Sequence, residues 1–198
     1  LALFSLMHQS VSHITCIVSL LAMSVLNWQP EHAIYLALVI LCFTLGSLLS
    51  GLILGNSQVA FGRHYGYPLS LIGILLLLAW LSLPYFPSYG LLWACVAMGV
   101  QNAMVSHYKG AIIRTTHLSG VLTDLGLAMG YRLRGLDVEP RRVVLHLLIL
   151  LGFLSGGILA SWLYPYLKLN AFLIPAGLSL MLSLIYWVIY LRYRHQHD

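Results

Sequence analysis

The sequence predicts an all-α integral membrane protein built from two inverted repeats, each with three transmembrane helices and a short helix that dips into the bilayer. Three observations support this fold class. Only 8% of the 198 residues are charged, with a mean hydropathy of +0.89, whereas soluble domains carry about 25% charged residues. Long apolar stretches follow one another along the chain, and two pairs of distant segments resemble each other.

The long apolar stretches are the predicted spans. A helix needs about 20 mostly apolar residues to cross a bilayer. Five stretches reach or approach this length: 33–55, 67–83, 89–108, 143–163 and 171–191.

Two further segments, 13–27 and 117–131, open with polar and small residues and then become apolar. A helix of this length rises only about 22 Å, so each segment either crosses the bilayer or dips into it and returns. If neither crosses, nine of the ten Lys and Arg residues share one side, and only Lys168 lies opposite. Positive charge gathers on the cytoplasmic side of membrane proteins, so the sequence favours dipping helices and a cytoplasmic C-terminus.

Internal similarity predicts the repeat. Segment 13–19 (HITCIVS) resembles 117–123 (HLSGVLT), 104 residues later, and 46–51 (GSLLSG) resembles 152–157 (GFLSGG), 106 residues later. Residues 1–84 would form the first repeat and 85–198 the second, within one membrane domain. Span 89–108 has no counterpart in the first half, so we expect a leading span that is largely absent from this chain, with residues 1–8 as its tail. Three crossings per repeat would insert the second copy upside down, as in secondary transporters.

Two runs resemble the YoaK-like family of small bacterial inner-membrane proteins, grouped as a domain of unknown function. They are 99–103 (GVQNA) and 114–126 (RTTHLSGVLTDLG), and 12–15 (SHIT) is similar to the family's first-half motif. The resemblance covers essentially the whole chain, although Cys16 and Ile17 stand where the family usually has Gly and Asn. It implies a multi-pass protein of the bacterial inner membrane, and the family is commonly labelled as small-metabolite transporters.

Polar residues in and around the dipping segments are the candidate site. The residues expected to form a substrate or proton path are His13, Thr15, Gln101, Asn102, Thr115, Thr116, His117, Ser119, Thr123 and Asp124. A carboxylate at membrane depth is costly and usually functional, so Asp124 could carry protons or bind a cation; alternatively it pairs with Arg114 or Arg132. The two histidines could relay protons or bind an anion, or they could cap their helices.

The remaining polar and small residues have structural alternatives. The hydroxyls beside His117 either line a narrow path, with Gly120 allowing close backbone approach, or bond between helices. Gln101 and Asn102 either contact substrate or bond to the segment that begins at His117. Small residues spaced four apart are expected to let helices pack closely: Ser47, Gly51, Gly55, Gly152, Gly156 and Ala160.

These patterns predict that the protein transports or conducts an unknown small solute, without a cofactor. No hydrolase, kinase or dinucleotide motif occurs, so an enzyme is not expected, and the three widely spaced cysteines have no metal-binding pattern. The net charge of +5 lies in loops that orient a membrane protein, which argues against a nucleic-acid partner. Two alternatives remain: a redox subunit with His13 and His117 as axial haem ligands, or an accessory subunit of a membrane complex. The bilayer is the expected partner, and the small size is compatible with a homo-oligomer.

Overall fold

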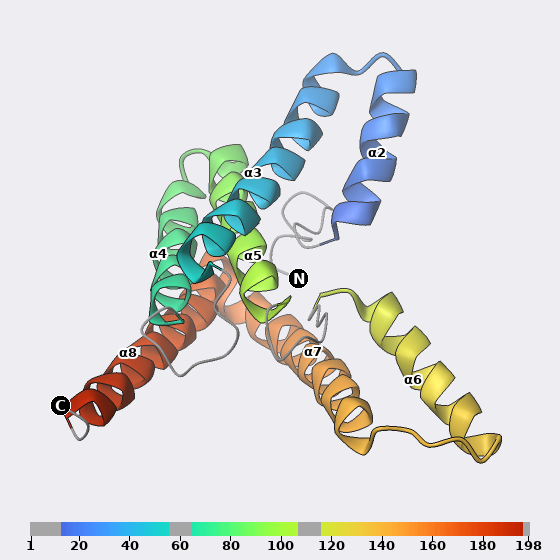
Figure 1. Ribbon diagram of the computed structural model, residues 1–198. Helices are drawn as coiled ribbons and strands as arrows, with labels where there is room; N and C mark the ends of the chain where they lie inside the picture. The colour runs from blue at the N-terminus through green and yellow to red at the C-terminus, as the bar shows by residue number, and fades with distance from the viewer. Residues whose placement is uncertain (1–12, 56–64, 107–115, 196–198) are drawn as a thin grey trace.

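The computed structural model describes residues 13–55, 65–106 and 116–195, and every regular element in these ranges is a helix (Figure 1). The elements are α2 (Ile14–Leu26), α3 (Pro30–Leu54), α4 (Gly66–Ser82), α5 (Pro87–Ser106), α6 (Leu118–Leu133), α7 (Pro140–Leu167), the 3₁₀ helix η1 (Lys168–Phe172) and α8 (Leu173–His195).

All seven segments that the sequence predicts as spans or dipping helices are helices in the structure. Pro30 and Pro140 stand in the first turn of α3 and α7, where a missing N–H costs nothing and the fixed φ suits a helix. Gly55 ends α3 with a positive φ of 58°, a conformation that glycine adopts without steric cost.

The packed centre of the molecule is formed by α3, α4, α5 and α8. α5 packs against both α3 and α4, and α4 packs against α8. The main buried cluster runs through α4, α5, η1 and α8 and includes Leu76, Ala79, Ala97, Val100 and Ala176. Many of its members are alanines, so the helix axes can approach closely.

The closest approach joins α3 and α5 at two glycines. A Cβ atom on Gly46 would overlap the backbone carbonyl of Val96, and a Cβ on Gly99 would overlap the backbone carbonyl of Phe43. The Ser47 hydroxyl beside this contact donates to the Gly99 carbonyl at 3.2 Å. The two backbones therefore touch directly, and no residue larger than glycine fits at either position.

Serine hydroxyls join α8 to α4. Ser179 donates to the Leu69 carbonyl at 2.8 Å, and Ser183 donates to the Gly66 carbonyl at 3.0 Å. The Ser183 hydroxyl also lies 2.6 Å from that of Ser70. Interhelical bonds of this kind contribute about 0.6–2 kcal/mol each within a membrane.

Two helical hairpins project from the centre. α2 packs on α3 and α6 packs on α7. Figure 1 shows that α2 and α6 begin near the middle of the molecule and run towards opposite ends. Each short helix thus spans about half of the molecule, and the following long helix returns along it.

Among the described residues, the small-residue motifs make a close helix contact at Ser47, and no neighbouring helix approaches their four glycines. A Cβ on Gly51, Gly55, Gly152 or Gly156 would meet no atom within 4 Å among the described residues. For α3, the reason is that α5 contacts the face that carries Gly46, and Gly51 lies on another face. No residue of α7 is buried.

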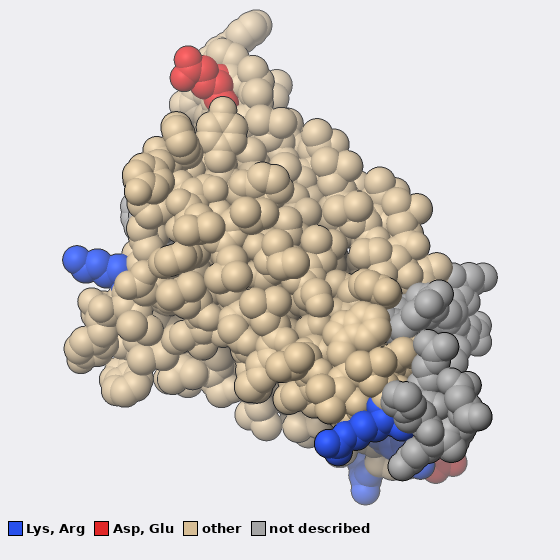
Figure 2. Space-filling model, turned by 90° about the vertical axis from the view of Figure 1, so that its left-hand side faces the viewer, with Lys and Arg blue, Asp and Glu red and all other residues tan. Residues whose placement is uncertain are grey.

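Two helical stretches are long and apolar enough to cross a membrane: Pro30–Leu54, and Pro140–Tyr193, which contains α7, η1 and most of α8. Figure 2 shows a broad face on which the described Lys, Arg, Asp and Glu residues lie only at the rim. The structure is therefore a helical protein with candidate membrane-spanning helices and a large uncharged surface.

The α3–α5 contact makes a direct prediction. Gly46→Ala should lower the free energy of unfolding in detergent by about 1–3 kcal/mol, because an overpacked contact must separate. Gly51→Ala is the matched control in the same helix. It should leave stability unchanged or raise it by up to about 1 kcal/mol, since alanine is the better helix former. Equal effects of the two substitutions would contradict the contact.

Candidate functional site

A cavity of about 910 Å³ lies where α2 and α6 begin. The middle of α3 and the end of α5 complete its wall. Its lining residues are His13, Ile14, Thr15, Cys16, Ser19, Phe43, Ser47, Asn102, Ala103, Thr116, His117, Leu118 and Ser119. Segments about 100 residues apart in the sequence therefore share one site.

Two helix N-termini point their first turns at this cavity. His13 and His117 occupy the N-cap positions of α2 and α6, with nearly the same backbone angles: φ −95° and ψ 67° for His13, φ −99° and ψ 66° for His117. Neither side chain caps its own helix, which is contrary to the alternative that they act as capping residues. The first N–H groups of a helix lack acceptors within the helix and carry partial positive charge.

The end of α5 is tied to the segment before α6 by a short hydrogen bond. The Thr116 hydroxyl donates to Asn102 Oδ1 at 2.6 Å, while Asn102 Nδ2 donates to the Met98 carbonyl at 2.9 Å. The sequence predicts a partner in the segment that begins at His117, and the structure shows Asn102 bonded to Thr116, the residue directly before that segment. Gln101 is half-buried and does not line the cavity.

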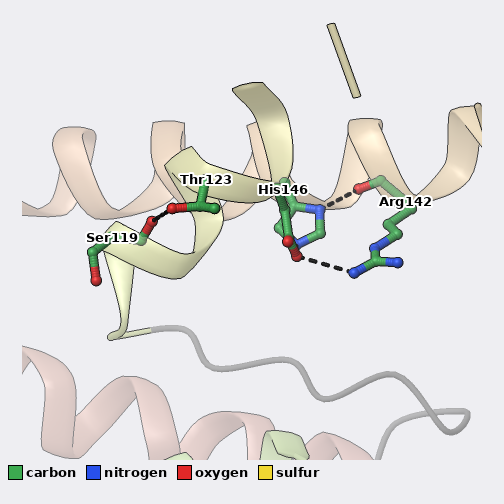
Figure 3. A network of polar contacts seen from close by, with 5 residues as sticks. Ser119, Thr123, Arg142 and His146 are labelled. Atoms are coloured by element: carbon green, nitrogen blue, oxygen red, sulfur yellow. Dashed lines mark hydrogen bonds and ion pairs between the residues drawn. The ribbon is translucent and has the colours of Figure 1, made fainter. Parts of the chain in front are cut away.

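The hydroxyl groups of Ser119 and Thr123 in α6 lie in different surroundings. Ser119 faces the cavity, whereas Thr123 donates to the Ser119 carbonyl at 2.9 Å within its own helix (Figure 3). A Cβ on Gly120 would meet only the His117 ring, at 3.1 Å. Among the described residues, no other backbone approaches Gly120, contrary to the alternative in which this glycine allows such an approach. Thr115 lies outside the described residues.

Asp124 belongs to a separate polar cluster between α6 and α7. Its Oδ2 lies 3.1 Å from Arg142 Nη2 and 3.2 Å from His146 Nε2. His146 Nδ1 lies 2.7 Å from the Arg142 carbonyl, and the contacts of Arg142 are drawn in Figure 3. This cluster borders a smaller cavity of about 290 Å³ that does not include His117.

Asp124 pairs with an arginine, as one of the alternatives has it, but the partner is Arg142 and not Arg132. The antiparallel hairpin places the first turns of α7 beside the middle of α6, and Arg142 and His146 are four residues apart on one face. Arg132 lies on α6 itself and Arg114 lies outside the described residues. The side chain of Asp124 is 35% exposed and that of Arg142 is 64% exposed. Since exposed pairs contribute about 0–1 kcal/mol, this contact orients the hairpin more than it stabilises the fold.

Sequence reasoning missed several residues of the cavity. Ser19 could have been predicted from the sequence, because it lies one helical turn after Thr15. In the structure its hydroxyl donates to the Thr15 carbonyl at 3.1 Å. Ser47 was interpreted only as a packing residue. Phe43 and Ala103 have apolar side chains, which do not indicate a binding site in the sequence. They line the cavity because α3 crosses α5. Within the described ranges, no three His, Cys, Asp or Glu residues are grouped as a metal site.

A family model described as "Protein of unknown function (DUF1275)" matches residues 1–185. The chain belongs to this family. No curated protein and no solved structure matches the sequence. Because the description of the family assigns no activity, the function has to be inferred from the site.

The Thr116–Asn102 bond can be tested by removing one hydroxyl. Thr116→Val should lower the free energy of unfolding in detergent by about 1 kcal/mol, because an interhelical bond is lost. Thr123→Val is the control, since its hydroxyl bonds only within α6, and it should change stability by less than half as much. A larger loss for Thr123→Val would show that the link between α5 and α6 is not formed.

Proposed function

We propose that this protein is a multi-pass membrane transporter or channel for a small solute, with its binding site in the cavity where α2 and α6 begin. Two stretches of membrane-spanning length and a broad uncharged face support the membrane assignment. The observation that carries the proposal is the convergence of two helix N-termini and two histidines on one cavity.

The arrangement also favours the inverted repeat. The helix pairs α2–α3 and α6–α7 follow the two halves of the sequence, and the two short helices run in opposite directions from a shared centre. In many secondary transporters the site lies where broken helices of two inverted repeats meet near the midplane. Polar backbone away from regular helix is tolerated at that depth where it lines a water-filled cavity. α2 and α6 would be the dipping helices of the two repeats.

The chemistry of the cavity favours a small anion or a solute with an anionic group. Helix N-termini attract negative charge, and the first turns of α2 and α6 both border the site. Hydroxyl and imidazole groups from Thr15, Ser19, Ser119 and the two histidines can donate hydrogen bonds. No Asp or Glu residue lines the cavity. Asp124 would act outside it, by holding α6 against α7.

Orientation follows from the basic residues. The described arginines lie in or beside the connection between α6 and α7 (Arg132, Arg134, Arg141 and Arg142) and at the end of α8 (Arg192 and Arg194), so we place both regions on the cytoplasmic side. Lys168, in η1, would lie on the opposite side.

Topology can be measured by cysteine labelling from outside intact cells, in a background without the three native cysteines. Lys168→Cys should react with a membrane-impermeant maleimide, while Arg134→Cys and Arg192→Cys should react only after the cells are opened. Tyr85→Cys, between α4 and α5, is the reference and should react from outside, as Lys168→Cys does. External labelling of both Tyr85→Cys and Arg134→Cys would show that α6 crosses the bilayer, and the dipping arrangement would be rejected.

Transport can be measured in proteoliposomes with a panel of probes. Uptake of formate, acetate, nitrate or inorganic phosphate should exceed uptake of potassium, choline and glycerol. His117→Asn should reduce the uptake of the preferred anion at least about tenfold, which corresponds to about 1.4 kcal/mol, because an imidazole donor of the cavity is replaced by a shorter amide.

The matched controls are His146→Asn and Asp124→Asn, which change polar groups outside the cavity. Both should retain more than half of the uptake. A loss of uptake in Asp124→Asn, with His117→Asn fully active, would instead support the carboxylate as the proton carrier and remove the cavity from the path. A visible Soret band in the purified protein would replace the anion assignment by the haem alternative at His13 and His117.

A further inference from the structure

The imidazole ring of His146 in α7 has both of its nitrogen atoms next to oxygen atoms. Nδ1 donates to the Arg142 carbonyl, one helical turn earlier, at 2.7 Å (Figure 3). A carbonyl oxygen can only accept, so Nδ1 carries a proton in this bond. Nε2 lies 3.2 Å from Asp124 Oδ2 of α6, and only 13% of the His146 side chain is exposed.

The contact with Asp124 requires a second proton on the ring. Asp124 Oδ2 already accepts a hydrogen bond from Arg142 Nη2 at 3.1 Å, which is the role of an ionised carboxylate. In a neutral ring with its proton on Nδ1, the lone pair of Nε2 would face this oxygen, and the contact would be repulsive. Both contacts are therefore favourable together only when the ring carries two protons. The geometry describes a site that binds one exchangeable proton between α6 and α7.

The charged and titratable groups around this ring come from α6, from the segment that connects α6 to α7, and from α7 itself. Those that line the small cavity beside His146 are Asp124, Tyr131, Asp137, Glu139 and Arg142. Asp137 and Glu139 are exposed, so protons can reach the ring from the side of the connecting segment. η1, which also packs on α7, follows the opposite end of that helix and contributes only Lys168 there.

Few apolar contacts hold α6 in place. α6 packs on α7, but Val121 is the only residue of α6 that is buried, and α7 has no buried residue. A segment with few buried apolar contacts opens at a low cost in free energy. The polar contacts between the two helices therefore have a large influence on the position of α6. Because α6 begins at the central cavity, its position also shapes the candidate site.

We propose that Asp124 and His146 form a proton-binding site through which the pH on the cytoplasmic side sets the position of α6. With the proton bound, His146 joins α7 to α6. Without it, Nε2 and the carboxylate repel each other and the hairpin loosens, while the Arg142 contact remains. The small cavity and the central cavity share no lining residue, so the proton acts through the helix and not by contact with the solute.

The direction of the response follows from the contacts. The protonated ring makes both contacts, so the hairpin is closed at low pH and loosens as the pH rises through the range of about 5 to 8 in which imidazole groups titrate. The proton site itself stands on the described contacts alone. Its cytoplasmic location and its effect on transport rest on the proposed function.

The first test is ¹⁵N NMR of the histidine-labelled protein in lipid vesicles, with His146 assigned by the loss of its signals in His146→Gln. Both ring nitrogens should be protonated at about pH 5.5, whereas at about pH 8 only Nδ1 should keep its proton. A ring protonated on Nε2 alone at the higher pH would overturn the proposal, because Nδ1 would then face the Arg142 carbonyl without a proton.

The second test follows α6 by distance measurements between two spin labels, in protein without the native cysteines. The labels are placed at Met129→Cys of α6 and Leu184→Cys of α8, which are 68% and 65% exposed. The population with the distance found at about pH 5.5 should fall at least about threefold at about pH 8. His146→Gln should keep that distance at both pH values, because its amide can donate to Asp124 and does not titrate.

The matched control is His32→Gln, which changes the histidine of the α2–α3 hairpin and should respond to pH as the native protein does. An unchanged distance in the native protein, or an equal response in His146→Gln, would overturn the proposal. Nitrate uptake is recorded in the same vesicles. Uptake without the distance change rejects the proton site alone, and the distance change without uptake of any probe rejects the transport function alone.

Discussion

The direct backbone contact between α3 and α5 is the constraint on which the rest of the structure depends. Gly46 and Gly99 remove the side chains that would otherwise hold the two helices apart. In a membrane there is no hydrophobic driving force between helices, because lipid tails are as apolar as leucine. In the membrane setting proposed for this protein, close van der Waals contact and a few hydrogen bonds would therefore hold the helices together. The Ser47 bond to the Gly99 carbonyl is one of these.

The position of the cavity follows from this contact. Once α3 and α5 cross at the two glycines, Ser47 and Asn102 lie on the same side of the crossing, and both line the cavity. Asn102 then holds Thr116, the residue before the N-cap of α6. The start of α6 is thereby fixed relative to α5, and the start of α2 faces it because α2 packs back along α3. The packing of α3 on α5 in the centre of the bundle thus sets the geometry of the polar site.

The two hairpins share a plan but differ in their polar contacts. The α6–α7 hairpin carries the ion pair of Asp124 with Arg142, close to the connecting segment. The α2–α3 hairpin has a neutral contact instead, in which Ser24 Oγ lies 2.9 Å from His32 Nδ1. The Ser24–His32 contact stands at the far end of its hairpin, and the Asp124 pair lies beside the middle of α6. Both are outside the cavity lining, so the polar groups there are imidazole, hydroxyl and amide groups. Such groups bind a solute without the large desolvation cost of a buried fixed charge.

Composition and apolar length by themselves determined the helical class and placed all seven helices within a few residues of their observed ends. This is possible because a membrane-length helix depends on a local run of apolar residues and on prolines at its start. The sequence also predicted one site from His13, Thr15, Thr116, His117 and Ser119. The internal similarity relates the segment around His13 to the segment around His117, which are too far apart along the chain for a local pattern to connect them. Only the tertiary structure decided that Asn102 and not Gln101 lines the cavity with them, that Asp124 pairs with Arg142 away from the cavity, and that Gly46 and Gly99 rather than Gly51 carry the helix contact. These outcomes depend on which face of one helix meets which face of another. The fit of side chains across the interface selects the faces that meet. The periodic pattern of apolar residues along one helix does not show which face of another helix it will contact.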